Sequence, residues 1–274
     1  MIGKVVLAVL PPMGLVGIRT SVTAIILFIV QAIRGRLWLK EKGDYWRLAL
    51  LSLFGVVFNQ LFFISGLSLT TASNTSLLAV MIPVFALTVG GIAGFERLTW
   101  IKVAGIAVAA AGVVILLDPR KASFSSRTTL GDLCIVINCL AYGIYVATSK
   151  HVITRNGTFR SMMWVFIFGS LVCVPLGAVS MSHVDIAAVP AYIWWVAIYI
   201  AIGATAAPYL LNAWALQKVD PSTVAVYVYL QPLIGFSLAV IFLGESLSLA
   251  FGIAAAIIFI GVFMVTRRYV PVET

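Results

Sequence analysis

The chain has 274 residues, of which 62% are hydrophobic and only 10% are charged, and its mean hydropathy is +1.11. Soluble globular proteins carry about 25% charged residues, so the composition excludes a soluble domain and predicts an integral membrane protein. The formal net charge of +9 does not indicate nucleic-acid binding. The basic residues cluster between apolar runs, where they act as topology signals.

Apolar runs long enough to cross a bilayer follow one another along the chain. A transmembrane helix needs about 20 apolar residues, and nine stretches approach or exceed that length after a short stub, Ile2 to Leu10. The predicted spans are Met13–Ile33, Trp46–Leu69, Ser73–Ala93, Lys102–Leu117, Thr129–Ser149, Phe159–Ser180, Tyr192–Gln217, Ser222–Leu243 and Leu247–Thr266. The stub is too short for the apolar region of a signal peptide, so we expect no cleaved leader.

The distribution of lysine and arginine predicts the orientation of the spans. If the charged loop from Arg34 to Arg47 faces the cytoplasm, alternation of the spans places most basic residues on that side. Only Arg120, Lys121 and Arg127 fall on the other side. Because basic loops are retained in the cytoplasm, we expect a multi-pass protein of the bacterial inner membrane with a cytoplasmic C-terminus.

The sequence contains a weak internal repeat. A unit with a small polar turn, an apolar run, a proline and a glutamate thirteen residues later occurs twice, 149 residues apart. The shift pairs Leu67 with Leu216, Ser73 with Ser222, Pro83 with Pro232, Glu96 with Glu245, Leu98 with Leu247 and Gly112 with Gly261. The pattern predicts two repeats, residues 1–122 and 129–269.

Each repeat has five spans if the stub is the end of a first helix that is incomplete in this sequence. An odd number of spans inverts the second copy relative to the membrane. The expected fold is therefore an all-α membrane protein with ten helices in a 5+5 inverted repeat. This arrangement is typical of secondary transporters, which bind their substrate near the membrane midplane between the copies.

Two copies of this unit in ten apparent spans resemble the EamA-type members of the drug/metabolite transporter superfamily. The second copy matches the family pattern more closely, through Ala215-Leu216, Val219-Asp220-Pro221-Ser222, Pro232 and Leu243-Gly244-Glu245. Arg19 also matches a family arginine near the start of the second span. The chain departs from the pattern at its N-terminus and at Phe95, where a glycine is usual.

The resemblance covers nearly the whole chain and implies a ten-helix exporter with a central cavity. Members of the family carry amino acids or other small amphipathic metabolites. The aromatic-rich spans of this chain are most similar to those of bacterial aromatic amino acid exporters, a finer prediction than the family itself.

Polar and aromatic residues at helical spacing are the candidates for lining a cavity. One helix face carries Asn138, Tyr142 and Tyr145, a second Thr205, Tyr209 and Asn212, and a third Thr223, Tyr227 and Gln231. The predicted substrate-binding residues are Asn59, Gln60, Asn74, Leu78, Asn138, Tyr142, Tyr145, Trp164, Tyr209, Asn212, Tyr227 and Gln231. Helix packing is the alternative role for each face, and a bulky core position is the expected role of Trp164.

The chemistry of these side chains indicates an amphipathic substrate. Aromatic rings offer a surface to an apolar side chain, while amides and phenols bind a polar head group at fixed geometry. A zwitterionic amino acid suits such a lining, whereas a wholly apolar drug would leave the amides without partners.

Two prolines lie within predicted spans at equivalent places in the two repeats. Pro83 and Pro232 each remove a backbone hydrogen bond and predict a kink. The kink is either a hinge that lets one end of the span move or static curvature of a packed bundle.

Five charged residues near span ends also have two interpretations. Glu96 and Glu245 precede the next helices, so we expect them to cap the positive helix end rather than to carry a proton. Lys4 and Lys150 would either take part in substrate-carboxylate binding or gating, or extend to the lipid head groups, and we expect the latter. Arg19 lies about 10 Å along its helix from Pro12, a depth from which an arginine can still reach the head groups, and we expect a structural role for it.

No motif for energy coupling is present. All nine acidic residues and both histidines, His151 and His183, fall in predicted loops or at span ends, whereas a proton relay uses ionisable groups within the membrane. The phosphate-binding loop G-x-x-x-x-G-K-[ST] is absent. We therefore expect ATP-independent transport down a gradient by alternating access.

Other classes of membrane protein fit less well. An enzyme would need clustered His, Asp or Glu, and a channel would need a charged ring or a carbonyl filter. A drug or nucleotide-sugar carrier of the same superfamily is the main alternative. We expect no cofactor, no metal and no disulfide, a small-molecule substrate and the lipid bilayer as partners, and a monomer.

Overall fold

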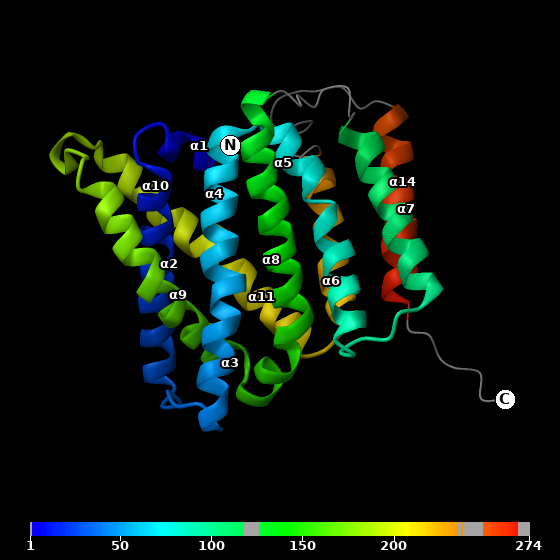
Figure 1. The fold of residues 1–274 in the computed structure, drawn as a ribbon, viewed down its shortest axis with the longest axis horizontal. Coiled ribbons are helices and arrows are strands. Elements are labelled where there is room, and N and C mark those ends of the chain that lie inside the picture. Colours follow the sequence, from blue (N-terminus) through cyan, green and yellow to red (C-terminus); the bar gives the residue numbers. More distant parts are fainter. Residues whose placement is uncertain (1, 118–125, 235–236, 238–248, 268–274) are drawn as a thin grey trace.

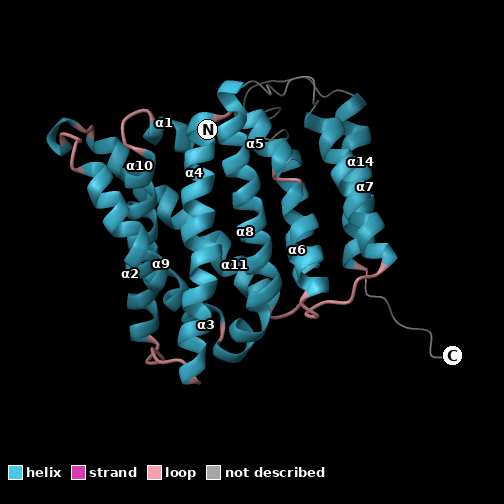
Figure 2. Ribbon diagram, in the orientation of Figure 1, coloured by secondary structure: helices cyan, strands magenta, loops and turns pink. Residues whose placement is uncertain are grey.

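The chain folds into a bundle of helices, with no strand among the residues that the structure describes (Figure 2). The structure is a computed structural model, and it describes residues 2–117, 126–234, 237 and 249–267. The helices are α1 (Ile2–Leu7), α2 (Pro12–Ile33), α3 (Lys42–Ser52), η1 (Leu53–Phe58), α4 (Asn59–Leu69), α5 (Ala72–Leu78), α6 (Met81–Ile92), α7 (Trp100–Leu117), α8 (Ser126–Asn156), α9 (Thr158–Met181), η3 (Ile186–Ala188), α10 (Ala191–Ala201), η4 (Ile202–Ala206), α11 (Ala207–Leu216), α12 (Pro221–Val226), η5 (Tyr227–Tyr229) and α14 (Leu249–Thr266).

Seven helical segments in this part of the chain are long and apolar enough to cross a membrane. They are Pro12–Ile33, Gly43–Leu69, Asn74–Ile92, Trp100–Leu117, Thr128–Asn156, Thr158–Met181 and Ala191–Leu216. They confirm seven of the predicted spans, except that the fifth was predicted too short: it continues past Ser149 to Asn156. The shorter apolar helix Phe251–Thr266 corresponds to the last prediction, and much of Ser222–Leu243 lies outside the described residues.

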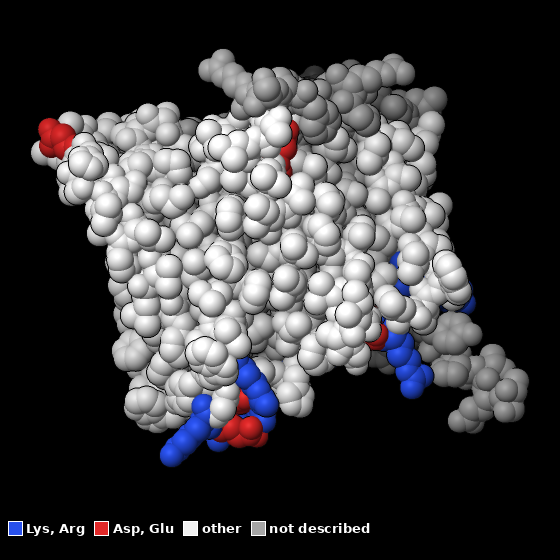
Figure 3. Space-filling view, in the orientation of Figure 1, with Lys and Arg blue, Asp and Glu red and all other residues white. Residues whose placement is uncertain are grey.

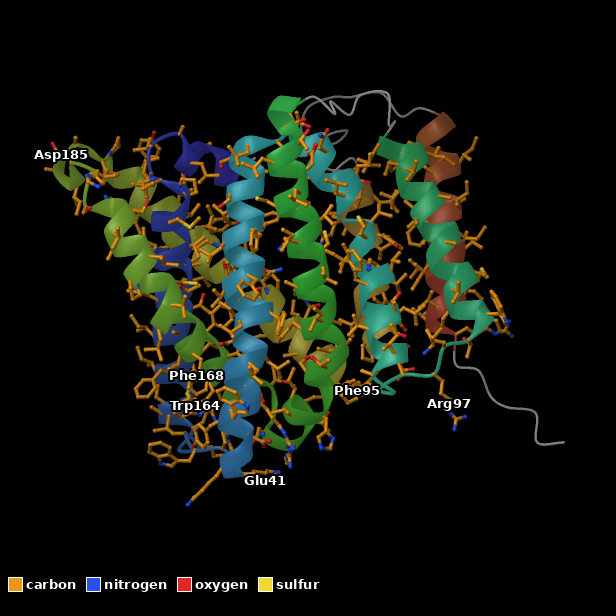
Figure 4. The ribbon with its side chains drawn as sticks, viewed as in Figure 1. Glu41, Phe95, Arg97, Trp164, Phe168 and Asp185 are labelled. Atoms are coloured by element: carbon orange, nitrogen blue, oxygen red, sulfur yellow. The ribbon has the colours of Figure 1, made fainter. Side chains whose placement is uncertain are left out.

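The surface of the bundle has the character of a membrane-embedded protein. Large apolar side chains such as Ile33, Leu171 and Trp195 are exposed by 83%, 68% and 72%. On the face shown in Figure 3, lysine and arginine gather at the lower end, and the long flank above them is uncharged. We call this lower end, which holds the 34–47 loop and Arg97, the basic end (Figures 3 and 4).

Two helix pairs pack closely because glycine allows their backbones to approach. In the first pair, α2 and α9 (Figure 1), a Cβ atom on Gly177 would lie only 3.0 Å from the Gly17 Cα. In the second pair, α7 and α14, a Cβ atom on Gly261 would lie 2.6 Å from the Gly105 carbonyl oxygen. Without a hydrophobic driving force in lipid, such small-residue contacts are how membrane helices associate.

Two of the spanning segments contain a wide π turn. The first segment runs through α3, η1 and α4, and the second through α10, η4 and α11. The two π turns begin at Leu53 and Ile202, which are 149 residues apart. A π turn inserts an extra residue into the helix and is common at functional sites.

The helices that carry the predicted hinge prolines are interrupted just before the proline. The chain leaves α5 at Leu78 and enters α6 at Met81, two residues before Pro83. In the other repeat, α12 gives way to the 3₁₀ turn η5, and helix resumes at Leu230, two residues before Pro232. Proline lacks the N–H that would pair with the carbonyl four residues earlier, which explains the position of both interruptions. Whether these points move as hinges stays a prediction.

Candidate functional site

Seven of the predicted binding residues, all buried or partly buried, meet in one network around Tyr209. Its hydroxyl oxygen lies 2.8 Å from Asn59 Oδ1 and also contacts the Gly55 carbonyl oxygen. Gln60 Nε2 donates to the same hydroxyl at 3.5 Å. Asn138 Nδ2 donates to the Asn59 carbonyl oxygen at 2.8 Å. We call Asn59, Gln60, Asn138, Tyr142, Tyr145, Tyr209 and Asn212 the central network.

The network joins three helices that are far apart in the sequence. Gln60 belongs to α4, Tyr142 to α8 and Asn212 to α11, which pass close to one another in the middle of the bundle (Figure 1). Asn212 Nδ2 donates to the Tyr142 hydroxyl at 2.5 Å and ties α11 to α8. The polar faces that the helical spacing predicted on α8 and α11 therefore turn toward each other.

Aromatic rings surround the polar contacts. The ring centroid of Tyr209 lies 6.4 Å from those of Tyr142 and Tyr145 and 5.0 Å from that of Phe166, which it meets edge to face. Tyr142 and Tyr145 stack at 6.0 Å. Sequence reasoning missed Phe166, because a single apolar residue in an apolar helix carries no signal of its own.

The π turns explain why backbone carbonyl groups take part. A regular α-helix pairs each interior carbonyl with the N–H four residues later, whereas a π turn shifts that pairing. The Gly55 carbonyl in η1 accepts from Tyr209. In η4, the Ala204 carbonyl lacks its α-helical donor because residue 208 is proline, and it accepts from Arg19 Nη2 at 3.4 Å.

Arg19 does not extend to the membrane surface but turns into the bundle. Its side chain is buried against η4, with 7% of the residue exposed, and its Nε donates to Thr205 Oγ1 at 2.9 Å. From the same face of α2, Thr23 Oγ1 donates to the Ala201 carbonyl at 3.1 Å. Helix α2 therefore contacts the second π turn through the charged Arg19 and the last residue of α10 through the neutral Thr23.

Asn74 lies in a different cluster, at the end of the bundle opposite the basic end. Its Nδ2 contacts both carboxylate oxygens of Asp132, at 2.9 and 3.1 Å, and Thr70 Oγ1 donates to the same group at 2.5 Å. Asp132 is 9% exposed. The sequence analysis correctly placed Asp132 near a span end. Its burial could not be predicted, because it depends on contacts with Thr70 and Asn74 from another part of the chain.

Trp164 occupies a packed position near the basic end of the bundle. Its Nε1 donates to the Leu37 carbonyl at 2.9 Å, and its ring lies 4.8 Å from that of Tyr45 and 5.5 Å from that of Phe168. Figure 4 shows Trp164 and Phe168 at the same end as Glu41. The structure therefore places Trp164 away from the central network, in the bulky core role expected of it.

The other three predicted residues lie around the interrupted helices. A cavity of about 320 Å³ lies between the α5–α6 junction, α7 and η5, and Gln231 lines it together with Ser76, Val80, Leu116, Tyr229 and Pro232. The carbonyl of Leu78 accepts from Cys139 Sγ at 3.6 Å. Tyr227 is 51% exposed. This volume is at the lower end of the range for small-molecule sites.

Glu96 caps a helix, but not the one expected. It follows the left-handed turn at Gly94, which ends α6, and its Oε2 accepts from the backbone N–H of Ser222 at 3.0 Å. Ser222 is in the first turn of α12, so the glutamate satisfies an unpaired N–H at the N-terminus of α12 instead of capping α7. It also accepts from the Ser222 hydroxyl and pairs with Lys102. Glu245 lies outside the described residues.

An ion-pair chain continues from this cap along the basic end. Lys102 Nζ lies 2.9 Å from Asp220 Oδ2, and Lys150 Nζ lies 3.4 Å from Asp220 Oδ1. Burial raises the pKa of Asp220, but Lys102 and Lys150 more than offset this effect, so the pKa is held below its usual value. Lys150 therefore has a carboxylate partner. The sequence analysis had instead expected its side chain to extend to the lipid head groups. The side chain of Lys4 is outside the described part of the chain.

A second buried carboxylate at the same end was missed. Asp44 is fully buried and accepts from Arg155 Nη2 at 2.8 Å and from Asn156 Nδ2 at 2.6 Å. Because Arg155 and Asn156 follow Asp44 by more than 110 residues, local spacing could not have revealed this contact.

Comparison with known proteins agrees with this architecture. The EamA-like transporter family matches residues 1–118 and 129–267. An uncharacterized transporter of Archaeoglobus fulgidus is 27% identical over 84% of this chain and 79% of its own length. A probable terminal-alkyne amino-acid exporter of Streptantibioticus cattleyicolor is 23% identical over 72% of this chain and 65% of its own length.

A solved crystal structure has a similar fold. It superposes with a TM-score of 0.77 at 21% sequence identity and covers 96% of this chain and 90% of its own. The family matches extend over most of the sequence, and the relatives named above are transporters rather than enzymes. The chain therefore belongs to the EamA-like transporter family and is a multi-pass membrane transporter of small molecules.

Proposed function

We propose that the protein is an ATP-independent secondary transporter that exports amino acids, aromatic or neutral ones included, and related small amphipathic metabolites. Two inverted five-helix repeats, residues 1–122 and 129–269, would rock against each other and expose the central network to each side of the membrane in turn. The observation that carries the proposal is that amides, phenols and aromatic rings meet around Tyr209 inside the bundle.

The positions of the helices support the repeat. Helices α3 and α10 begin 149 residues apart, at Lys42 and Ala191, and so do α7 and α14, at Trp100 and Leu249. The family matches twice, once in each proposed repeat. Gln60 and Tyr209, which contact each other, are also separated by 149 residues. Equivalent positions meet in this way when two related copies face each other across an axis.

The nature of the substrate rests on the chemistry of the central network. Its rings suit an apolar side chain, and its amides and hydroxyls suit a polar head group. The named amino-acid exporter among the relatives supports the same class. We also propose that the protein is a monomer in a bacterial inner membrane with its C-terminus in the cytoplasm. The gathering of lysine and arginine at one end (Figure 3) supports a cytoplasmic position for the basic end.

Counterflow in proteoliposomes tests this proposal. Liposomes loaded with an unlabelled amino acid should accumulate the same labelled amino acid transiently, without ATP and without a pH gradient, and the initial rate should saturate with concentration. A panel of aromatic, neutral, acidic and basic amino acids would rank the substrates by competition. If none of them exchanges, the amino acid assignment is wrong; if exchange requires a pH gradient, the uncoupled mechanism is wrong.

A further inference from the structure

Arg19 places a positive charge beside the central network without an acidic partner among the described residues. Its guanidinium group contacts only neutral oxygens there, the Thr205 hydroxyl at 2.9 Å and the Ala204 carbonyl at 3.4 Å. Both partners lie in η4, which leads directly into α11 and Tyr209. By contrast, the buried carboxylates of Asp44 and Glu96 are paired with Arg155 and Lys102.

Support of the π turn does not by itself require a charge. Thr23 already binds the Ala201 carbonyl at the end of α10, directly before η4, through a neutral hydroxyl at 3.1 Å. An arginine inside a bilayer is costly, and such residues face the bundle interior and mark substrate pathways. A guanidinium has five N–H donors in a planar fork, and the two contacts above use two of them.

The central network also lacks any charge of its own. Its seven members are asparagine, glutamine and tyrosine side chains, which are neutral hydrogen-bonding groups, whereas an amino acid carries a carboxylate. Arginine matches a carboxylate with two parallel hydrogen bonds, which are stronger than bonds between neutral groups. Arg19 is therefore the one described side chain next to the network whose charge complements a carboxylate.

We propose that Arg19 binds the carboxylate of the transported solute with the N–H groups that Thr205 and Ala204 leave free. This inference rests on the proposed function and deepens it, because it assigns a specific contact to the acid group of the substrate. The carboxylate would lie between α2 and η4, with the side chain of the solute toward the rings around Tyr209. Solutes that lack the acid group would lose this contact.

A pair of matched solutes tests the inference. Phenylalanine and phenylalaninamide differ only in the replacement of the carboxylate by a neutral amide. In counterflow with the wild-type protein, phenylalanine should be preferred by about tenfold or more, the effect of roughly 1.4 kcal/mol. Arg19→Gln should remove that preference by slowing phenylalanine, with amide flux changed less than about twofold. Arg19→Lys, which keeps the charge, should retain part of the preference.

Thr23→Val is the control for a purely structural role, because it removes the neighbouring neutral contact with the Ala201 carbonyl, directly before η4, and leaves the charge. It should affect both solutes equally. An equal loss of both fluxes in Arg19→Gln would overturn the inference. So would a wild-type protein that carries the amide as fast as the acid, a result that does not depend on the variant folding. If the wild-type protein exchanges no amino acid at all, the proposed function fails instead.

Discussion

Tyr209 is the residue on which most contacts of the central network depend. Its hydroxyl reaches Asn59, Gln60 and the Gly55 carbonyl. Tyr209→Phe would keep the ring and leave these buried groups without a partner, at a cost of about 1–3 kcal/mol. We expect a lower melting temperature in detergent and a counterflow rate reduced by about tenfold.

The matched control is Tyr145→Phe in the same ring cluster. The Tyr145 hydroxyl contacts the Met162 sulfur at 3.4 Å, and thioether sulfur is a weak acceptor. This variant should therefore keep both its stability and its flux close to wild type. If the two variants behave alike, the polar contacts of Tyr209 have no special role in transport.

Asp220 gives the basic end a defined response to pH. Its folded-state pKa lies below the usual value, so the stabilisation from Lys102 and Lys150 is fully present above about pH 4, the usual range for aspartate. It is lost as the pH falls through the lowered folded-state pKa.

We therefore expect Asp220→Asn to lower the melting temperature at pH 7. Below about pH 4, the melting temperature of this variant should fall less steeply with pH than that of the wild-type protein. Thermal unfolding in detergent between pH 2 and 8 would measure both. Asp185→Asn, at the opposite end (Figure 4), is the comparison, since Asp185 accepts only a local N–H at 3.1 Å. An acid response equally weakened in both variants would contradict the pairing.

At the scale of elements, the interruption between α5 and α6 is the candidate hinge. Pro83→Ala would supply the missing N–H and allow one continuous helix. We expect unchanged or increased thermal stability and a flux reduced by about tenfold, if bending at this point is part of the cycle. Pro175→Ala, within α9, should leave flux nearly unchanged. If the Pro83→Ala protein has normal flux, the interruption is static curvature and not a hinge.

The contact between α7 and α14 depends on glycine at position 261. A Cβ atom there would lie 2.6 Å from the Gly105 carbonyl oxygen, and backbone atoms cannot easily move away. Gly261→Ala should therefore lower stability by about 1–3 kcal/mol. On the same helix, a Cβ atom on Gly252 meets nothing within 4 Å, so Gly252→Ala should be neutral or slightly stabilising. Comparable melting temperatures for the two variants would refute this packing.

At the scale of the whole molecule, the sequence predicted the membrane class, seven confirmed spans and the members of the central network. Apolar run length and helical spacing are local properties, which is why Tyr142 and Asn212 could be placed on inward faces before their contact was known. The proline interruptions were predictable for the same reason, because proline acts on its own helix.

Contacts between distant segments were beyond prediction. Glu96 was correctly expected to cap a helix, but α12 as its target is set by the packing of the two halves. Arg19 lies only seven residues from Pro12, a depth of about 10 Å, so local sequence could not distinguish the membrane surface from η4. The burial of Asp44 and Asp132 likewise depends on partners from other helices.

The central claim is that the network around Tyr209 faces each side of the membrane in turn. Its most direct test uses Asn212→Cys in a background with Cys134, Cys139 and Cys173 replaced by alanine. An impermeant thiol reagent is added to right-side-out and to inside-out vesicles. The account predicts labelling from both sides, slowed by a transported amino acid. Labelling from one side only or from neither side, or labelling that no amino acid alters, would contradict it.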